Sequence, residues 1–248
     1  MQLVAAGRVT VRGALASKAA TAVEPDAALL VLDDVEDAGW ASRGAHKLLG
    51  ALDAFEPDGL VVAGRRCLDA GASTGGFTDV LLRRGAAQVV AVDVGYGQLA
   101  WRLRTDERVV VLDRTNVRAL KPDDIGGRVD LVVADLSFIS LRLVLPALLA
   151  CAQDDADLVP MVKPQFEVGK QRLGSGGVVR DPGLRAEAVL DVVHAAARLG
   201  LRLRGVVASP LPGPSGNVEF FAWLRRGEPR ATDEAGELVR AAVSDHPS

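Results

Sequence analysis

The sequence predicts an α/β protein whose main part is a doubly wound, mostly parallel β-sheet. Two observations support this fold class. From residue 41 onward, short apolar runs alternate with stretches of helical periodicity, as in consecutive βα units. Near the C-terminus, the apolar runs 201–209 and 218–225 are joined by a connector too short for a crossover helix, so we expect them to pair antiparallel.

The first 34 residues are predicted to form a separate, β-rich segment. Residues 8–12 alternate as a strand does, and residues 28–33 make a second short strand. A segment of this length is too small to bury a core of its own. The acidic stretch 35–41 is interpreted as a linker, and residues 42–248 as the main domain.

The main domain begins with a predicted helix at 42–55, which places Leu48, Leu49, Leu52 and Phe55 on one face. Several of the strands that follow are continuously apolar, as expected when helices cover both faces of a parallel sheet. The predicted strands are 66–69, 88–93, 108–112, 129–135 and 157–163, and the predicted helices are 76–84, 98–104, 141–150 and 181–199.

The C-terminal hairpin narrows the fold class. A parallel sheet closed by one antiparallel pair resembles the class I (Rossmann-like) methyltransferase fold, whereas a dinucleotide-binding dehydrogenase lacks this hairpin. The glycine turn after the first strand also departs from the GxGxxG spacing, which weakens an NAD interpretation.

The composition excludes several classes of protein. With 49% apolar and 25% charged residues, the chain is predicted to fold rather than to be disordered. A net charge of −3 gives no overall sign of nucleic-acid binding, although a local basic patch is compatible with it. Cys67 and Cys151 lie in apolar runs and the three histidines are scattered, so we expect buried thiols and no metal.

No apolar run approaches the ~18 residues that a membrane-spanning helix needs. The N-terminus also lacks a charged region followed by a long hydrophobic stretch, so no signal peptide is predicted. We therefore expect a cytoplasmic protein without a membrane partner.

The candidate cofactor site follows the first strand. Its residues are predicted to line a glycine-rich turn at the carboxyl edge of the sheet, where backbone can approach a ligand closely: Asp69, Gly71, Ser73, Gly75 and Phe77. Asp93 ends the next strand, at a distance suited to hydrogen bonding with ribose hydroxyls. After the third strand, Asn116 is favoured over Asp113 as the partner of an adenine edge.

Three ionisable residues are predicted to meet at the same edge: Asp135, Lys163 and Glu219. The neighbours of Lys163 are apolar, and a partly desolvated lysine suits a proton acceptor. Methyl transfer from a sulfonium is an in-line displacement that needs alignment and a deprotonated nucleophile, but no metal. The sequence 135–138 lacks the Asn-Pro-Pro-aromatic turn typical of enzymes that methylate base amines, so a ribose hydroxyl is the favoured nucleophile.

The chain resembles the TlyA family, whose members also carry the name hemolysin A and are ribosomal RNA 2′-O-methyltransferases related to FtsJ. The resemblance rests on the segments 42–48, 69–77, 93–98, 134–138, 162–167 and 215–219. It implies S-adenosylmethionine as cofactor, cytidine in the RNA of ribosomal subunits as target, and a catalytic tetrad of Lys47, Asp135, Lys163 and Glu219 with Lys163 as base. Asp135 is also predicted to bind the cofactor.

The same resemblance implies an S4-like RNA-binding module, of which residues 1–34 resemble the second half. The glycine-rich, basic loop 167–177 is predicted to contact RNA phosphate. The candidate RNA contacts are Arg8, Arg12, Lys18, Arg43, Lys170 and Arg172. A membrane-active hemolysin, a catalytically inert RNA-binding protein and a dehydrogenase are the alternatives, and the oligomeric state stays open.

Overall fold

The computed structural model describes residues 9–11, 14–15, 29–31, 39–213, 215–228 and 230–245, with the backbone alone at residues 9–11, 14–15, 29–31, 170 and 175. The chain divides into two compact units, Met1–Trp40 and Ala41–Ser248. In the first unit, a small antiparallel sheet has the order β2-β1-β3, from β1 (Val9–Val11), β2 (Ala14–Leu15) and β3 (Leu29–Val31). The S4-like character of this segment stays a prediction.

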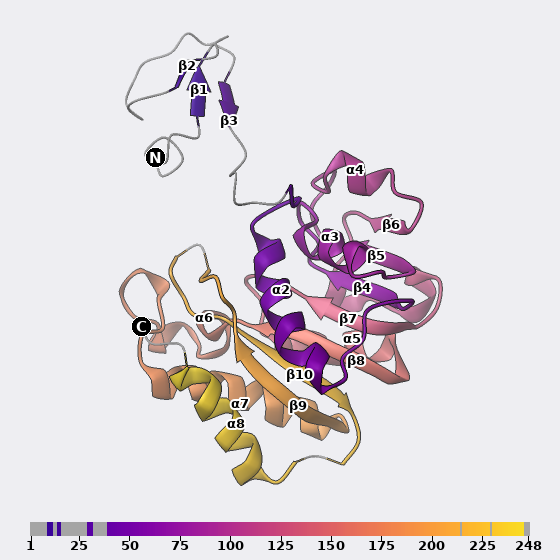
Figure 1. Cartoon of the computed structure of the whole chain (residues 1–248). Coiled ribbons are helices and arrows are strands. Elements are labelled where there is room, and N and C mark those ends of the chain that lie inside the picture. The colour runs from indigo at the N-terminus through magenta and orange to yellow at the C-terminus, as the bar shows by residue number, and fades with distance from the viewer. Residues whose placement is uncertain are drawn as a thin grey trace. The chain divides into compact units, whose positions relative to one another are not determined.

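The second unit is built on a seven-stranded sheet with the order β6-β5-β4-β7-β8-β10-β9 (Figure 1). Strands β4 to β8 run parallel, and β10 pairs antiparallel with both β8 and β9. The predicted fold class is confirmed, including the reversed C-terminal hairpin. The strands are β4 (Arg66–Ala70), β5 (Gln88–Val92), β6 (Val109–Leu112), β7 (Val129–Ala134), β8 (Ala152–Val162), β9 (Leu201–Ala208) and β10 (Phe220–Arg226).

Helices cover both faces of this sheet, as the apolar strands predict. One face packs against α5, α7 and α8, and the other against α2 and α3 (Figure 1). The helices are α2 (Gly44–Phe55), α3 (Gly76–Arg83), α4 (Trp101–Arg104), α5 (Leu141–Ala150), α6 (Pro164–Glu167), α7 (Pro182–Arg198) and α8 (Thr232–Ser244). No helix among the described residues is both long and apolar enough to cross a bilayer.

Residues of β10 connect the sheet to both helical layers. Phe220 belongs to the core under α5 and α7. On the opposite face, Phe221 lies 5.9 Å from the ring of Phe77, and Trp223 lies 5.5 Å from the ring of Phe55. Burial of such large side chains contributes about 2–3 kcal/mol each, so the antiparallel strand is fixed firmly within the sheet.

Strand β8 is longer than predicted. It begins at Ala152, whereas the apolar pattern indicated a start at 157. The extra residues 153–155 are polar and exposed, but their backbone stays extended. Hydrophobic periodicity misses such a strand end because these side chains do not enter the core.

Candidate active site

The candidate site lies where the parallel strands end. Asp69 is the last but one residue of β4, and three further residues directly follow the other strands: Asp93 follows β5, Asp135 follows β7 and Lys163 follows β8. The amide of Asp135 donates to the carbonyl of Ala70 over 3.0 Å, which carries the β4–β7 pairing one residue past the strand. Parallel strands bring their carboxyl ends to one edge, so these side chains converge without being close in sequence.

The glycine turn after β4 is held in a conformation that side chains disfavour. Gly71 has φ +91°, and a Cβ there would collide with the backbone carbonyl of Asp135. Gly75, with φ +100°, is the N-cap of α3, and a Cβ there would strike Leu103. Glycine at both positions therefore allows the turn to pack tightly against the residues after β7 and against α4.

Asp93 fixes the middle of the same turn. Its Oδ2 accepts from the amide of Ser73 over 2.8 Å, and its Oδ1 accepts from the amide of Gly95 over 2.7 Å. Ser73 has φ +48°, an uncommon value for a residue other than glycine. A carboxylate offers about four acceptor positions, so Asp93 retains capacity for the predicted ribose hydroxyls.

Asp69 is fully buried beneath this turn. Its Oδ2 accepts from the Thr78 hydroxyl over 2.7 Å, while Oδ1 has no hydrogen-bond partner among the described residues. Burial raises the pKa of Asp69 to about 7, repulsion from Asp135 and Asp93 adds to the rise, and the bond from Thr78 opposes it. A cation bound over the turn would favour the charged form of this carboxyl.

Phe77 and Asn116 have contacts of their own within the protein. The ring of Phe77 is buried against Phe221, which fixes α3 on the sheet. Asn116 is exposed, its Oδ1 accepts from the amide of Arg118 over 3.0 Å, and it lines a cavity of about 360 Å³ beyond β6. Asp113, the weaker candidate, forms an ion pair with Arg104.

The four residues of the implied tetrad form two ion pairs. Lys163 Nζ lies 2.5 Å from Asp135 Oδ1, and Lys47 Nζ lies 2.5 Å from Glu219 Oε2. Glu219 is completely buried, and both lysines are buried as well. The reversed direction of β10 places Glu219 just before that strand, at the edge where the parallel strands end.

Two further polar side chains complete these pairs. Lys163 Nζ also donates to Ser137 Oγ over 3.0 Å, and Gln165 Nε2 donates to Glu219 Oε1 over 3.1 Å. Sequence reasoning did not single out Ser137 or Gln165. Both lie within two residues of a predicted site residue, but only the folded loops show which way they point.

A pocket of about 750 Å³ opens beside Lys163 and Glu219. The loop after β7 forms one wall, and the segment after Lys163 forms another. Phe138 stands in the first wall with 91% of its surface exposed and φ +63°, and its ring lies 5.2 Å from that of Phe166. Residues 215–219 form a third wall, in which the side chain of Asn217 accepts from the amide of Val179 and donates to the carbonyl of Gly177.

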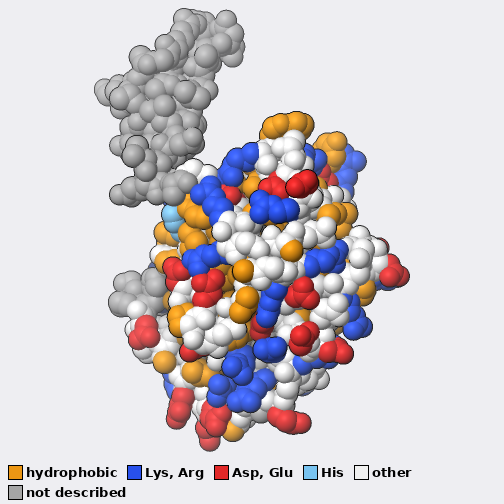
Figure 2. Space-filling view, turned by 45° about the vertical axis from the view of Figure 1, so that its right-hand side comes forward, with side chains coloured by type: hydrophobic (Ala, Val, Ile, Leu, Met, Phe, Trp, Pro, Cys, Tyr) orange, Lys and Arg blue, Asp and Glu red, His pale blue; other side chains and the backbone are white. Residues whose placement is uncertain are grey.

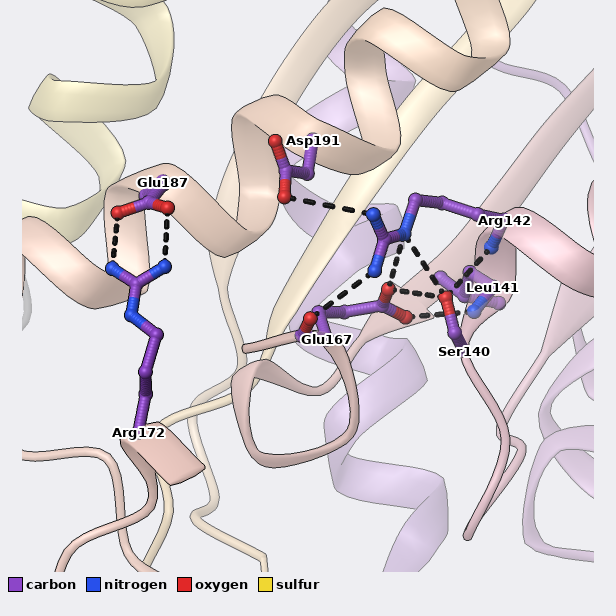
Figure 3. A network of polar contacts seen from close by, with 7 residues as sticks. All are labelled: Ser140, Leu141, Arg142, Glu167, Arg172, Glu187 and Asp191. Atoms are coloured by element: carbon purple, nitrogen blue, oxygen red, sulfur yellow. Dashed lines mark hydrogen bonds and ion pairs between the residues drawn. The ribbon is translucent and has the colours of Figure 1, made fainter. Parts of the chain in front are cut away.

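The predicted RNA contacts are described only in part. Arg8, Arg12 and Lys18 lie outside the described residues, as does the side chain of Lys170. Arg43 is exposed immediately before α2. Arg172, at the end of a short 3₁₀ turn (Lys170–Arg172), forms a two-bond ion pair with Glu187 of α7, at 2.5 Å for each bond (Figure 3).

The fold and the site together define an S-adenosylmethionine-dependent methyltransferase: a sheet closed by a reversed hairpin, with a glycine turn flanked by carboxylates at its edge. The comparisons with known proteins agree. The FtsJ-like methyltransferase family matches residues 40–226, and the chain belongs to this family.

Individual relatives are similar over most of their length. The 16S/23S rRNA (cytidine-2′-O)-methyltransferase TlyA of Mycobacterium tuberculosis is 64% identical, over 99% of this chain and 91% of that protein. The 23S rRNA (cytidine-2′-O)-methyltransferase TlyA of Campylobacter jejuni is 37% identical, over 73% of this chain and 69% of that protein. A hemolysin-named structure from Streptococcus thermophilus superposes with a TM-score of 0.82 at 37% identity, covering 98% of this chain and 89% of that one.

Proposed function

We propose that this protein transfers the methyl group of S-adenosylmethionine to the ribose 2′-hydroxyl of a cytidine in ribosomal RNA. The relatives named for this reaction supply the substrate class. The observation that carries the chemistry is the contact of Lys163 Nζ with Asp135 and Ser137 beside the pocket.

The methyl donor fits the glycine turn. Gly71 and Gly75 allow the tight turn at which the cofactor is proposed to lie, and Asp69, Asp93 and Asp135 place three acidic groups around it, which would favour a cationic cofactor. Asn116 is the proposed partner of the adenine, and Ser73 and Phe77 shape the turn. When bound, the cofactor supplies an electrophilic methyl group on a sulfonium. Among the described residues, no cluster of three metal-ligating side chains occurs.

Lys163 is the proposed base. A ribose hydroxyl is a very weak acid, so the Lys163 amine, in its neutral form, would take the hydroxyl proton while the ribose oxygen bonds to the methyl carbon. Asp135 holds the amine of Lys163 in place, and Ser137 supplies a second contact. Glu219, which lines the pocket and is held by Gln165, is proposed to orient the ribose together with its ion-pair partner Lys47.

The pocket accepts a nucleotide that is turned out of its helix. Its volume of about 750 Å³ is typical of a site for a molecule of that size. The exposed ring of Phe138, beside Phe166, offers a face on which a nucleobase can stack.

RNA affinity is proposed to come from several local contacts rather than from overall charge. On the face shown in Figure 2, Lys and Arg side chains are interspersed with Asp and Glu. Arg43, Lys170 and Arg172 in the second unit, together with the segment that carries Arg8, Arg12 and Lys18, are the proposed phosphate contacts. With a ribosomal substrate, the proposed site of the reaction is the cytoplasm.

The test is methyl transfer from radiolabelled S-adenosylmethionine to isolated ribosomal subunits, followed by nucleoside analysis. We expect labelled 2′-O-methylcytidine, and a loss of at least about 100-fold in kcat for Lys163→Ala, as for other positioned bases. Lys121→Ala, at an exposed lysine, is the matched control. Absence of transfer by the wild type refutes the function, and equal rates for Lys163→Ala refute the base.

The hemolysin name of some relatives suggests a different outcome, which the same preparation can check. Leakage from liposomes at protein concentrations that methylate no RNA would favour a membrane-active protein. Absence of any saturable binding of S-adenosylmethionine in calorimetry would favour an inert RNA-binding protein instead.

A further inference from the structure

Glu167 is a buried carboxylate close to the site that does not line the pocket. It is the last residue of α6, four positions after Lys163, and only 5% of its surface is exposed. An ionised group in such a place is costly unless it is paired and hydrogen-bonded. The contacts of the Glu167 carboxylate therefore indicate its structural role.

The contacts of its carboxylate reach the end of the loop that follows β7 and the first turn of α5. Oε2 accepts from the Ser140 hydroxyl over 2.5 Å, and Oε1 accepts from the amide of Leu141 over 2.7 Å (Figure 3). Ser140 is the N-cap of α5, so the carboxylate lies at a helix N-terminus, where unpaired amides favour a negative charge.

Arg142 neutralises this buried charge. Its Nε lies 3.3 Å from Glu167 Oε2, and its Nη2 donates to the Glu167 carbonyl over 3.2 Å. A weaker ion pair of 3.7 Å links Arg142 to Asp191 on α7 (Figure 3). The network thus joins the start of α5, the end of α6 and the surface of α7.

The loop 135–140 and the segment 163–167 are consequently tied at both ends. At the near end, Lys163 contacts Asp135 and Ser137. At the far end, Glu167 contacts Ser140 and the residue after it. Phe138 lies between the two ties in a left-handed conformation, which costs about 1–2 kcal/mol and persists only where its surroundings enforce it.

We propose that Glu167 is a positioning residue for methyl transfer: it clamps loop 135–140 against the segment after β8 and so holds Asp135 and Lys163 in register. The inference rests on the proposed function, because it acts through Lys163. Without the clamp, the two pocket walls are joined by the contacts of the reacting lysine and by the ring contact between Phe138 and Phe166.

The test is Glu167→Gln, which keeps the size of the side chain and one acceptor oxygen but removes the charge. We expect kcat to fall about 10- to 100-fold, as when a reacting group is misplaced by up to about 1 Å, with the calorimetric Kd of S-adenosylmethionine unchanged. In a Lys163→Ala background, the same substitution should cause no further loss, since its effect passes through that lysine.

Asp191→Asn is the matched control: it changes the charge of the same network at a half-exposed position without touching either loop, and should keep the wild-type rate. Should Glu167→Gln fail to fold, Ser140→Ala, which removes one hydrogen bond, is expected to show a smaller loss with the same dependence on Lys163. A wild-type rate for Glu167→Gln, or an equal fold-loss with and without Lys163, overturns the inference. Absence of transfer by the wild type would instead overturn the proposed function.

Discussion

Removal of one partner from the Lys47–Glu219 ion pair should destabilise the protein strongly. Glu219 is completely buried and the side chain of Lys47 is only 11% exposed. In Glu219→Gln, an amide group can keep the bond from Gln165, but the ammonium of Lys47 is left facing a neutral group. One-sided loss of a buried pair costs about 3–5 kcal/mol, and we expect a drop of that size in the free energy of unfolding.

Replacement of Lys47 as well as Glu219 provides the control for this loss of stability. In Lys47→Met with Glu219→Gln, no buried charge is left unpaired, and most of the lost stability should return because apolar replacements of buried pairs are often neutral. Methyl transfer should stay low in both variants. Guanidinium unfolding at equilibrium measures the stabilities. A loss below about 1 kcal/mol in the single variant, or a double variant that is no more stable than the single one, would refute the reasoning.

Three more predictions concern other parts of the site. The pKa of Asp69 is raised to about 7 in the folded state, so the folded protein binds this proton more tightly than the unfolded chain does. The free energy of unfolding should therefore decline as the pH rises from about 4 to about 7. Unfolding curves of Asp69→Asn should show a flatter decline. Gly71→Ala should weaken S-adenosylmethionine binding at least about 10-fold in calorimetry, whereas Gly64→Ala, with φ +76° but open space around it, should leave the affinity unchanged. Glu187→Gln should free Arg172, tighten RNA binding and steepen its dependence on log salt by about 1, and an unchanged slope would remove Arg172 from the RNA contacts.

The layout of the sheet could be predicted from sequence because its signals are local. Apolar runs lead directly to Asp69, Asp93 and Asp135 in the sequence. The short connector after residue 209 fixed the direction of β10, and with it the edge at which Glu219 lies.

Lys47 was named only through the family resemblance, although its helix carries a signal. Lys47, Ala51 and Phe55 are spaced at i, i+4 and i+8, and all three are buried on one side of α2. A lysine in line with core positions is unusual enough to mark a paired or functional group. The apolar face predicted from the sequence did not include Lys47 or Ala51.

The contacts of Ser137, Gln165 and Glu167 could not be predicted in the same way. Each depends on two loops from different strands meeting at hydrogen-bond distance, and no periodicity encodes that. Their positions follow from tertiary packing, so they appear only once the strand ends are placed side by side.

The order of the strands places cofactor binding and orientation of the ribose in different halves of the sheet. The glycine turn and Asp93 follow β4 and β5 in one half of the sheet, whereas Glu219 belongs to the hairpin whose outer strand, β9, ends the other half. The outermost strand on the cofactor side, β6, has four residues and is only partly buried, whereas β9 has eight residues and contacts α2, α7 and α8. A sheet opens most easily at its least buried outer strand. Mild denaturant should therefore weaken binding of the methyl donor before it disturbs the hairpin that carries Glu219.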